Sequence, residues 1–366
     1  MRKFYTGAAL MVCSMGLSVA SFAGNKDRSG QAGATQLLIN PWGQSTGVFG
    51  MNSAYVGGLD AMKNNIAGLS RVGKTQVGAA YSRYLAGSGV TVNNLGFAQR
   101  VGNSGVVGAN IMAMSYGEIT ITDYNNPEGG VGTYNPQFYN VMVGYSHEFS
   151  ENISVGAGAT FVSEQIPDAK ASGIVFEAGI QYVTGADDNF HFGVTLRNIG
   201  TGMKYSGSGF SINSEAPEDK TYTINRQVPS EQFEMPTYLN IGLAYDFYLD
   251  KNRVSTEEEQ STEQTGPKHR LTPMANFTSN SFNNDYIGGA VEYAFKETIM
   301  LRGGYRYENK IGDQALSTTF YTGLCAGATV QFSIGETGPK MALDYSYRST
   351  RRPNNGIHTF TLRLMR

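Results

Sequence analysis

Segments of about ten residues with alternating apolar and polar side chains recur from residue 74 to the end of the chain. Alternation with a period of two places the two kinds of side chain on opposite faces of a β-strand. We predict fourteen strands: 74–84, 90–100, 105–115, 137–149, 153–164, 174–183, 190–198, 237–249, 269–278, 286–295, 299–308, 320–334, 340–349 and 357–366. An even number of strands can close with both chain ends on one side. We therefore predict an all-β fold, a transmembrane antiparallel β-barrel spanning residues 74–366.

The last predicted strand illustrates the two faces of such a barrel. Phe360, Leu362 and Leu364 alternate with Thr361 and Arg363. One face suits lipid and the other suits a polar lumen. Segments 90–100 and 137–149 alternate poorly, so the strand count rests least firmly on them.

The composition fits a curved sheet at a membrane interface. Of 366 residues, 46 are Gly, 22 Tyr and 19 Phe, and only 16% of the chain is charged. Aromatic girdles and glycine kinks are typical of membrane barrels. A secreted soluble β-sandwich with many turns has a similar composition and stays an alternative. The formal net charge of −2 gives no indication of a nucleic-acid partner.

The first residues predict export. Arg2 and Lys3 precede an apolar stretch, 7–20, and Ser21-Phe22-Ala23 supplies the small residues of a cleavage site. We expect a signal peptide over residues 1–23, cleaved in the mature protein. Cys13 lies inside the apolar stretch, which argues against lipidation there. No later apolar run reaches 18 residues, so any membrane span must consist of strands.

The connections between predicted strands differ in length on the two sides. One side has short turns: 102–104, 150–152, 185–189, 296–298 and 335–339. The other has mostly longer loops: 116–136, 165–173, 199–236, 279–285, 309–319 and 350–356. This asymmetry is expected of an outer-membrane barrel with periplasmic turns. Segment 250–268 departs from it, either as an acidic insertion or through a slipped register.

Residues 24–73 do not alternate. They are rich in Gly, Asn and Ser, with short apolar patches at 37–39 and 60–62. We expect this segment to fold into the lumen as a plug; a disordered periplasmic tail is the alternative.

Two stretches of this segment resemble a known family. Leu37-Leu38-Ile39-Asn40-Pro41-Trp42, followed by the glycine-rich 47–51, resembles the start of mature PorV and PorQ proteins. Asn64-Asn65-Ile66-Ala67-Gly68-Leu69 is similar to the "NPAGL" element of those proteins and of FadL-type transporters, with Asn65-Ile66 in place of Pro-Ala. The resemblance extends over most of the chain through the strand count and the N-terminal segment.

The resemblance implies a FadL-like barrel with its N-terminal segment inside. It also implies an outer-membrane component of the type IX secretion system that binds translocon or cargo proteins. Our leading hypothesis is therefore a non-enzymatic secretion component surrounded by outer-membrane lipid. A FadL-like outer-membrane channel for hydrophobic small molecules is the alternative.

The polar faces of the strands carry charges of both signs. The predicted lumen charges are Glu177, Arg197, Asp246, Glu292, Arg302, Arg306, Asp344, Arg348 and Arg363. Charges of opposite sign can neutralise one another when buried. We expect paired charges in a closed lumen rather than an ion-selective ring, for which a single sign would be better suited.

The longest loop is the candidate contact with a partner protein. Loop 199–236 contains Tyr205, Phe210, Tyr222 and Phe233 among Gly and Ser residues. Long loops on a rigid scaffold often carry binding sites; a solvated loop without a partner is the alternative.

Gly117 follows the third strand, where FadL-like barrels can break a strand to open a lateral gap; an ordinary bend is the simpler interpretation.

The sequence contains no catalytic pattern. His147, His191, His269 and His358 lie on separate segments without metal-ligand spacing. Cys325 fits as a small inward residue. We expect no enzyme activity, no metal and no cofactor.

Overall fold

The computed structural model describes residues 24–215, 222–250, 268–313, 315–335, 338–351 and 355–366. The predicted signal peptide and most of the acidic segment 250–268 lie outside the described residues. The wall consists of β1 (Thr75–Arg83), β2 (Thr91–Val101), β3 (Gly105–Ser115), β6 (Gln137–Glu148), β7 (Ile153–Ile166), β8 (Ala169–Thr184), β9 (Phe190–Gly200), β14 (Tyr238–Tyr245), β16 (His269–Asn280), β17 (Tyr286–Phe295), β18 (Ile299–Glu308), β19 (Tyr321–Ser333), β20 (Lys340–Thr350) and β21 (Ile357–Met365).

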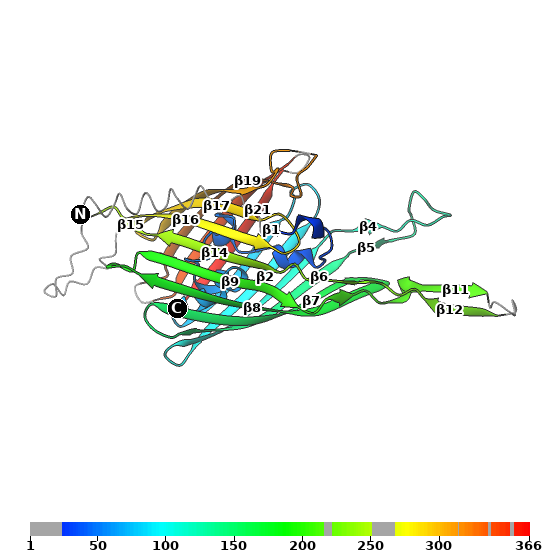
Figure 1. Cartoon of the computed structure of the whole chain (residues 1–366), viewed down its shortest axis with the longest axis horizontal. Helices are drawn as coiled ribbons and strands as arrows, with labels where there is room; N and C mark the ends of the chain where they lie inside the picture. Colours follow the sequence, from blue (N-terminus) through cyan, green and yellow to red (C-terminus); the bar gives the residue numbers. More distant parts are fainter. Residues whose placement is uncertain (1–23, 216–221, 251–267, 314, 336–337, 352–354) are drawn as a thin grey trace.

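These strands form one closed antiparallel ring, which confirms the predicted fold class (Figure 1). The first strand pairs with the last, with Gln76 opposite Met365. On the far side of the ring β14 pairs with both β9 and β16. Every wall strand therefore has two neighbours, so all backbone groups of the ring can be paired without water.

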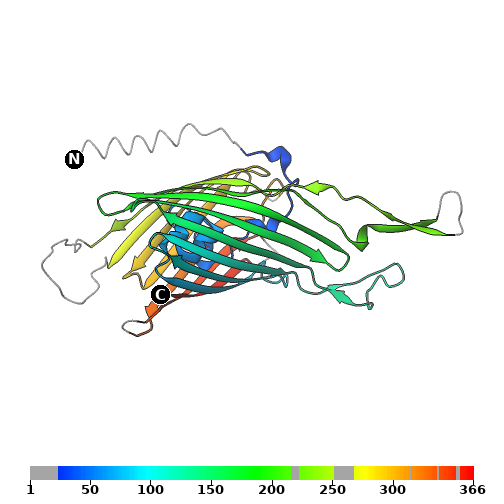
Figure 2. The ribbon, with the colours of Figure 1, turned by 90° about the horizontal axis from the view of Figure 1, so that it is seen from below.

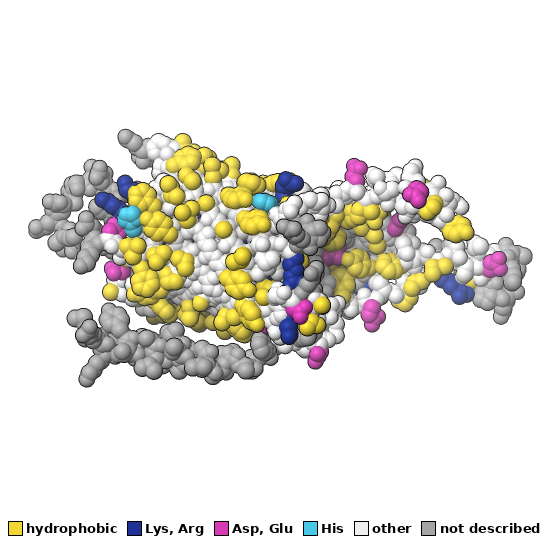
Figure 3. Space-filling model, turned by 90° about the horizontal axis from the view of Figure 1, so that it is seen from above, with side chains coloured by type: hydrophobic (Ala, Val, Ile, Leu, Met, Phe, Trp, Pro, Cys, Tyr) yellow, Lys and Arg dark blue, Asp and Glu magenta, His cyan; other side chains and the backbone are white. Residues whose placement is uncertain are grey.

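The two faces of the wall differ as the alternation predicts. Outward side chains are large and apolar, for example Leu95 at 62% exposed, Leu324 at 58% and Ile287 at 56%. Figure 3 shows such side chains spread over the wall. The residues between them point inward and most are buried; many are small or polar, and a few, such as Val106, Met112 and Met142, are apolar. An outer surface of this kind suits hydrocarbon rather than water.

The two ends of the barrel differ. Short turns such as 102–104 and 296–298 lie at one end, which we call the turn end. At the other, the loop end, hairpins project beyond the wall (Figures 1 and 2). They contain β4 (Ile119–Thr120), β5 (Thr133–Tyr134), β10 (Met203–Lys204), η5 (Ser208–Phe210), β11 (Ser211–Glu215), β12 (Thr223–Gln227) and β13 (Gln232–Phe233). A further short strand, β15 (Phe247–Tyr248), extends the line of β14 and pairs with β16.

One predicted loop is wrong. Residues 165–173 form continuous strands, because β7 runs to Ile166 and β8 begins at Ala169. Only Pro167 and Asp168 separate the two strands. Their pairing continues past the wall, with Gln165 opposite Lys170. Small residues such as Ala171 and Gly173 weaken the alternation of this stretch. Water can also reach both of its faces beyond the wall, so the pattern does not predict a strand there.

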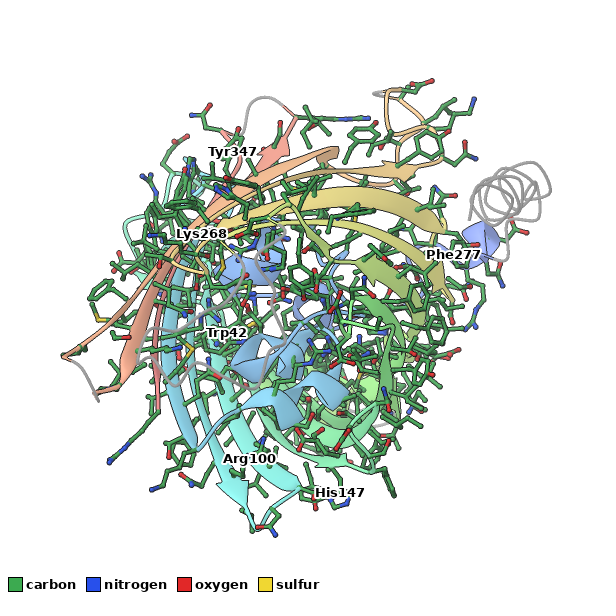
Figure 4. All side chains as sticks on the ribbon, turned by 90° about the vertical axis from the view of Figure 1, so that its left-hand side faces the viewer. Trp42, Arg100, His147, Lys268, Phe277 and Tyr347 are labelled. Carbon is green, nitrogen blue, oxygen red and sulfur yellow. The ribbon has the colours of Figure 1, made fainter. Side chains whose placement is uncertain are left out.

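Residues 34–72, here called the inner segment, lie inside the ring. They contain η2 (Thr35–Leu38), α2 (Gly43–Thr46), η3 (Gly58–Lys63) and η4 (Ile66–Arg71), preceded by η1 (Lys26–Arg28). Figure 4 looks along the barrel from the turn end, where Arg100 and His147 lie, and shows Trp42 within the ring. Among the described residues, no helix is both long and apolar enough to cross a membrane.

Candidate functional site

The inner segment packs against glycine-rich wall strands. Trp42 is completely buried in a cluster with Leu59, Met62 and Leu69. A Cβ atom at Gly96 or Gly78 would come within 2.7 or 2.9 Å of its indole ring. The wall therefore needs glycine at these two positions so that the ring can lie flat against the backbone.

The amide residues of the inner segment hold it together and to the wall. The Asn65 amide donates to the carbonyl oxygens of Ser53 and Ile180, each at 3.0 Å, and Ile180 belongs to β8. The Asn64 amide donates to Asn52 Oδ1 at 2.7 Å. These two residues of the resemblance motif thus have structural roles in packing.

The other motif residues also lie in the inner segment. Asn40 Oδ1 accepts a hydrogen bond from the Trp42 backbone N–H at 3.0 Å, and Pro41 between them is buried. Gly68 lies so close to Val56 that a Cβ atom would be 2.0 Å from its carbonyl oxygen. All six predicted motif residues therefore form this segment's internal turns and wall contacts.

A row of charged and hydroxyl side chains joins wall strands from β9 to β21 around part of the lumen. His191 contacts Asp246 at 2.9 Å, and Arg270 links Asp246 to Glu292 at 3.4 and 2.8 Å. The row then continues through Arg302, Thr329, Asp344 and Arg363. Of the nine predicted lumen charges, seven are in close ion pairs here or in the separate pair Arg197–Glu177, whose atoms lie 2.6 Å apart. This part of the lumen is charged yet internally paired.

Sequence reasoning missed Arg270, which joins two carboxylates of the row. The alternation of side chains could have indicated Arg270, since it lies on the same inward face of its strand as Thr272 and Met274. Asp60 of the inner segment was missed as well. Asp60 is completely buried, and its two carboxylate oxygens have no hydrogen-bond partner within the described chain. Burial raises the pKa of Asp60 to about 7, although the charge of Arg363 opposes this shift.

A cavity of about 490 Å³ lies at the loop end of the lumen, between the inner segment and the wall. Its floor includes Asn40, Phe49 and Lys63 of the inner segment. Aromatic rings and amides from the wall and loops complete it: Tyr84, Tyr116, Tyr238, Asn240, Asn276, Tyr286, Phe320 and Tyr321. A cavity of this size suits a small organic molecule.

The two remaining predicted lumen charges, Arg306 and Arg348, line this cavity. The Arg306 guanidinium carbon lies 4.1 Å from the ring centre of Phe49 and 4.5 Å from that of Tyr286. Its nearest carboxylate, Glu308, is 3.8 Å away. The Nε atoms of both arginines are buried without a hydrogen-bond partner in the described residues.

Lys63 is a third cation in the cavity lining and gave no sequence signal. Its side chain is 4% exposed, and its ammonium makes no hydrogen bond or ion pair with any described residue. Burial lowers the pKa of Lys63 to about 8; neighbouring Arg197 lowers it further and Glu177 raises it. The ammonium therefore still carries its charge at pH 7.

The aromatic residues of the predicted partner loop separate into two groups. Tyr205 and Phe233 pack on a buried cluster around Leu37, with ring centres 5.5 Å apart. Phe210 and Tyr222 lie on the projecting hairpin, where Tyr222 is 58% exposed. Of the four, only Tyr222 is exposed, whereas Tyr205, Phe210 and Phe233 are half-buried.

The described residues contain no group of three His, Cys, Asp or Glu side chains suited to a metal ion. Cys325 is buried against the carbonyl oxygen of Gly304 at 3.4 Å.

Gly117 has a left-handed backbone, φ +78°, between the end of β3 and β4. It is the start of a projecting hairpin.

Comparison with known proteins shows a likeness in fold. The sequence matches no family model and no curated protein. The P. putida toluene transporter TodX superposes with a TM-score of 0.52 at 12% identity, over 89% of this chain and 97% of TodX. A TodX mutant described as a monoaromatic hydrocarbon channel gives 0.52 at 13%, over 88% and 96%. A Pseudomonas aeruginosa FadL homologue gives 0.48 at 12%, over 88% and 97%.

These comparisons give no support to the resemblance to PorV and PorQ proteins. The solved structures named above are similar to this chain in fold alone, because their sequence identity to it is low. The similar solved structures are described as transport channels. The chain is thus a closed fourteen-stranded antiparallel barrel with a fold similar to that of the TodX channel.

Proposed function

We propose that this protein is an outer-membrane channel that admits small, partly apolar molecules from the loop end. The apolar outer surface supports a location in lipid, and the predicted signal peptide supports export. The fold is similar to that of TodX, whose descriptions name toluene and monoaromatic hydrocarbons. In this orientation the loop end faces outward and the turn end faces the periplasm.

The observation that carries this proposal is the cavity at the loop end. The inner segment forms its floor through residues such as Phe49 and Lys63, while wall strands form its sides. Below this floor, Trp42 and Leu59 fill the space between the inner segment and the wall. We propose that the inner segment is a plug, and that passage requires it to move.

Uptake into proteoliposomes tests the channel. Phenyl β-glucoside is a suitable probe because it carries an aromatic ring and crosses lipid slowly. The purified mature protein should accelerate its uptake over that of protein-free liposomes. Thr319→Trp, in the cavity lining, should slow uptake, whereas Ser88→Trp on an exposed turn at the same end should not. Wild-type uptake no faster than in protein-free liposomes would reject the proposal.

A second candidate is the protein-binding role in type IX secretion that the family resemblance implies. The projecting hairpin favours it, since isolated two-stranded hairpins are marginally stable in water and Ile212 and Tyr222 are 55% and 58% exposed there. Deleting residues 206–228 should leave the barrel folded and reduce the recovery of secretion proteins in a pull-down from native membranes. Unchanged recovery would reject this second role.

A further inference from the structure

The cavity at the loop end has an excess of positive charge. Its charged lining residues are three cations, Lys63, Arg306 and Arg348, and one carboxylate, Glu308. Buried charges are costly unless they are paired. A neutral hydrocarbon would leave two of the three positive charges unbalanced, since Glu308 can balance only one, whereas an anionic ligand would supply the missing counter-charge.

The two arginines are preorganised for a carboxylate. Arg306 is held between Phe49 and Tyr286, and Arg348 lies 5.4 Å from the Tyr321 ring centre. Stacking fixes the plane of a guanidinium group, and the unpartnered Nε atoms leave hydrogen-bond donors available. A planar fork of donors matches a carboxylate in two parallel hydrogen bonds.

Lys63 occupies a different part of the same cavity. Its charged neighbours are Arg197 and Glu177, on β9 and β8. Arg306 and Arg348 project from β18 and β20, and in the ring β14, β16 and β17 separate β9 from β18. Since Arg197 already pairs with Glu177 at 2.6 Å, this corner keeps one excess positive charge.

We propose that the cavity binds organic dianions, with one acidic group at Arg306 and Arg348 and the other at Lys63. Apolar side chains that line the same cavity, including Ile39 and Phe320, would contact the body of the ligand. This inference rests on the proposed channel function and names its substrate class. It departs from the neutral hydrocarbons named for TodX.

Titration calorimetry on the detergent-solubilised mature protein tests the ligand class. The probes are terephthalate, a flat aromatic dianion; benzoate, with one carboxylate; and 1,4-benzenedimethanol, a neutral analogue of terephthalate. Terephthalate should bind about tenfold more tightly than benzoate, the order expected of one charge-assisted contact. The diol should bind most weakly. A diol that binds as tightly as terephthalate, or terephthalate that does not bind, would overturn the inference.

Variants locate the two anionic groups. Lys63→Met and Arg306→Gln should each weaken terephthalate binding about tenfold and have a smaller effect on the diol. Lys63→Arg should retain binding, and Arg83→Gln, exposed on the outside of β1, should leave it unchanged. Heat-modifiable migration in gels identifies the folded variants. Equal terephthalate affinity in folded Lys63→Met and wild type would contradict the role of Lys63.

Wild-type protein supplies a test that needs no destabilising substitution. The pKa of Lys63 is about 8, so raising the pH from about 7 to about 9.5 should remove its charge and weaken terephthalate binding. Lys63→Arg should show no such loss. Binding and uptake also separate the two proposals. Terephthalate that binds, with neither terephthalate nor phenyl glucoside entering proteoliposomes faster than protein-free liposomes, refutes the channel alone. Phenyl glucoside uptake without terephthalate binding refutes the dianion site alone.

Discussion

The hydroxyl oxygens of Thr46 and Ser346 lie 2.6 Å apart and join the inner segment to β20. Next to this contact, the backbone N–H of Gly43 donates to Thr361 Oγ1 at 2.9 Å, and Arg363 donates to Gln44 Oε1 at 2.9 Å. Each such hydrogen bond contributes on the order of 1 kcal/mol. The inner segment is therefore held by contacts that single substitutions can weaken.

Arg100 should hold the C-terminal end of the inner segment in place at the turn end of the barrel. From β2 it donates to the backbone oxygens of Ser70 at 2.5 Å, Val72 at 2.8 Å and Gly73 at 2.8 Å. Arg100→Ala should destabilise the packing of η4 inside the ring by about 2 kcal/mol, because hydrogen bonds from a charged donor are lost. Hydrogen exchange of the η4 amides should become faster.

Arg351→Ala is the matched control for this prediction. Arg351 also donates to backbone oxygens, those of Ile311 and Asp313, but at the loop end and without touching the inner segment. Its removal should leave exchange in η4 unchanged. Equal exchange in Arg100→Ala and wild type would contradict the anchoring role.

Asp60 should make the stability of the inner segment, packed inside the ring, depend on pH. Its pKa is raised to about 7, above the usual 3.8, so the folded form favours the protonated carboxyl. The stabilising contribution is complete below about pH 4 and is lost as the pH rises through 7. Acrylamide quenching of Trp42, the single tryptophan, should therefore increase as the pH rises from about 4 to about 7 and then level off.

Asp60→Asn removes the titrating group at nearly constant size. Its quenching should stay flat over the same pH range, because the amide that replaces the carboxyl does not titrate. The same pH dependence in Asp60→Asn and wild type would show that another group is responsible.

Gly96 should be required for the packing of the Trp42 ring against the wall. A Cβ atom there would lie 2.7 Å from the indole Cζ2 atom, so Gly96→Ala forces the ring or the strand to move. The expected cost is about 1–3 kcal/mol, seen as greater quenching of Trp42. Gly303→Ala, whose nearest atom would be the Cys325 oxygen at 3.8 Å, should have no effect. No difference between the two variants would contradict the packing described.

The alternation of side chains predicted the wall because each strand separates two solvents. In β18, for example, Leu301 is 54% exposed on the outer face and Arg302 is 6% exposed on the inner face. The pattern disappears where strands project beyond the wall, since water can then reach both faces. This explains why β4, β5, β10 to β13 and the beginning of β8 could not be read from the sequence.

The cavity could be predicted only in part. Arg306 and Arg348 follow from the polar faces of their strands. Lys63 lies on a 3-10 helix without alternation, and its neighbours Arg197 and Glu177 are more than 100 residues away in the chain. The contact of Phe49 with Tyr321, ring centres 4.8 Å apart, likewise depends on closure of the whole ring.

A reversible cross-link between the inner segment and the wall tests whether the inner segment moves to open the channel. In a Cys325→Ala background, Thr46→Cys/Ser346→Cys replaces hydroxyl oxygens that lie 2.6 Å apart and should form a disulfide. Ser82→Cys/Thr359→Cys, from hydroxyl oxygens 2.9 Å apart, joins β1 to β21 within the wall and is the control. Oxidation should abolish phenyl glucoside uptake only in the first protein, and reduction should restore it. Uptake that is the same in the oxidised and reduced forms of the first protein would contradict an inner segment that moves to open the channel.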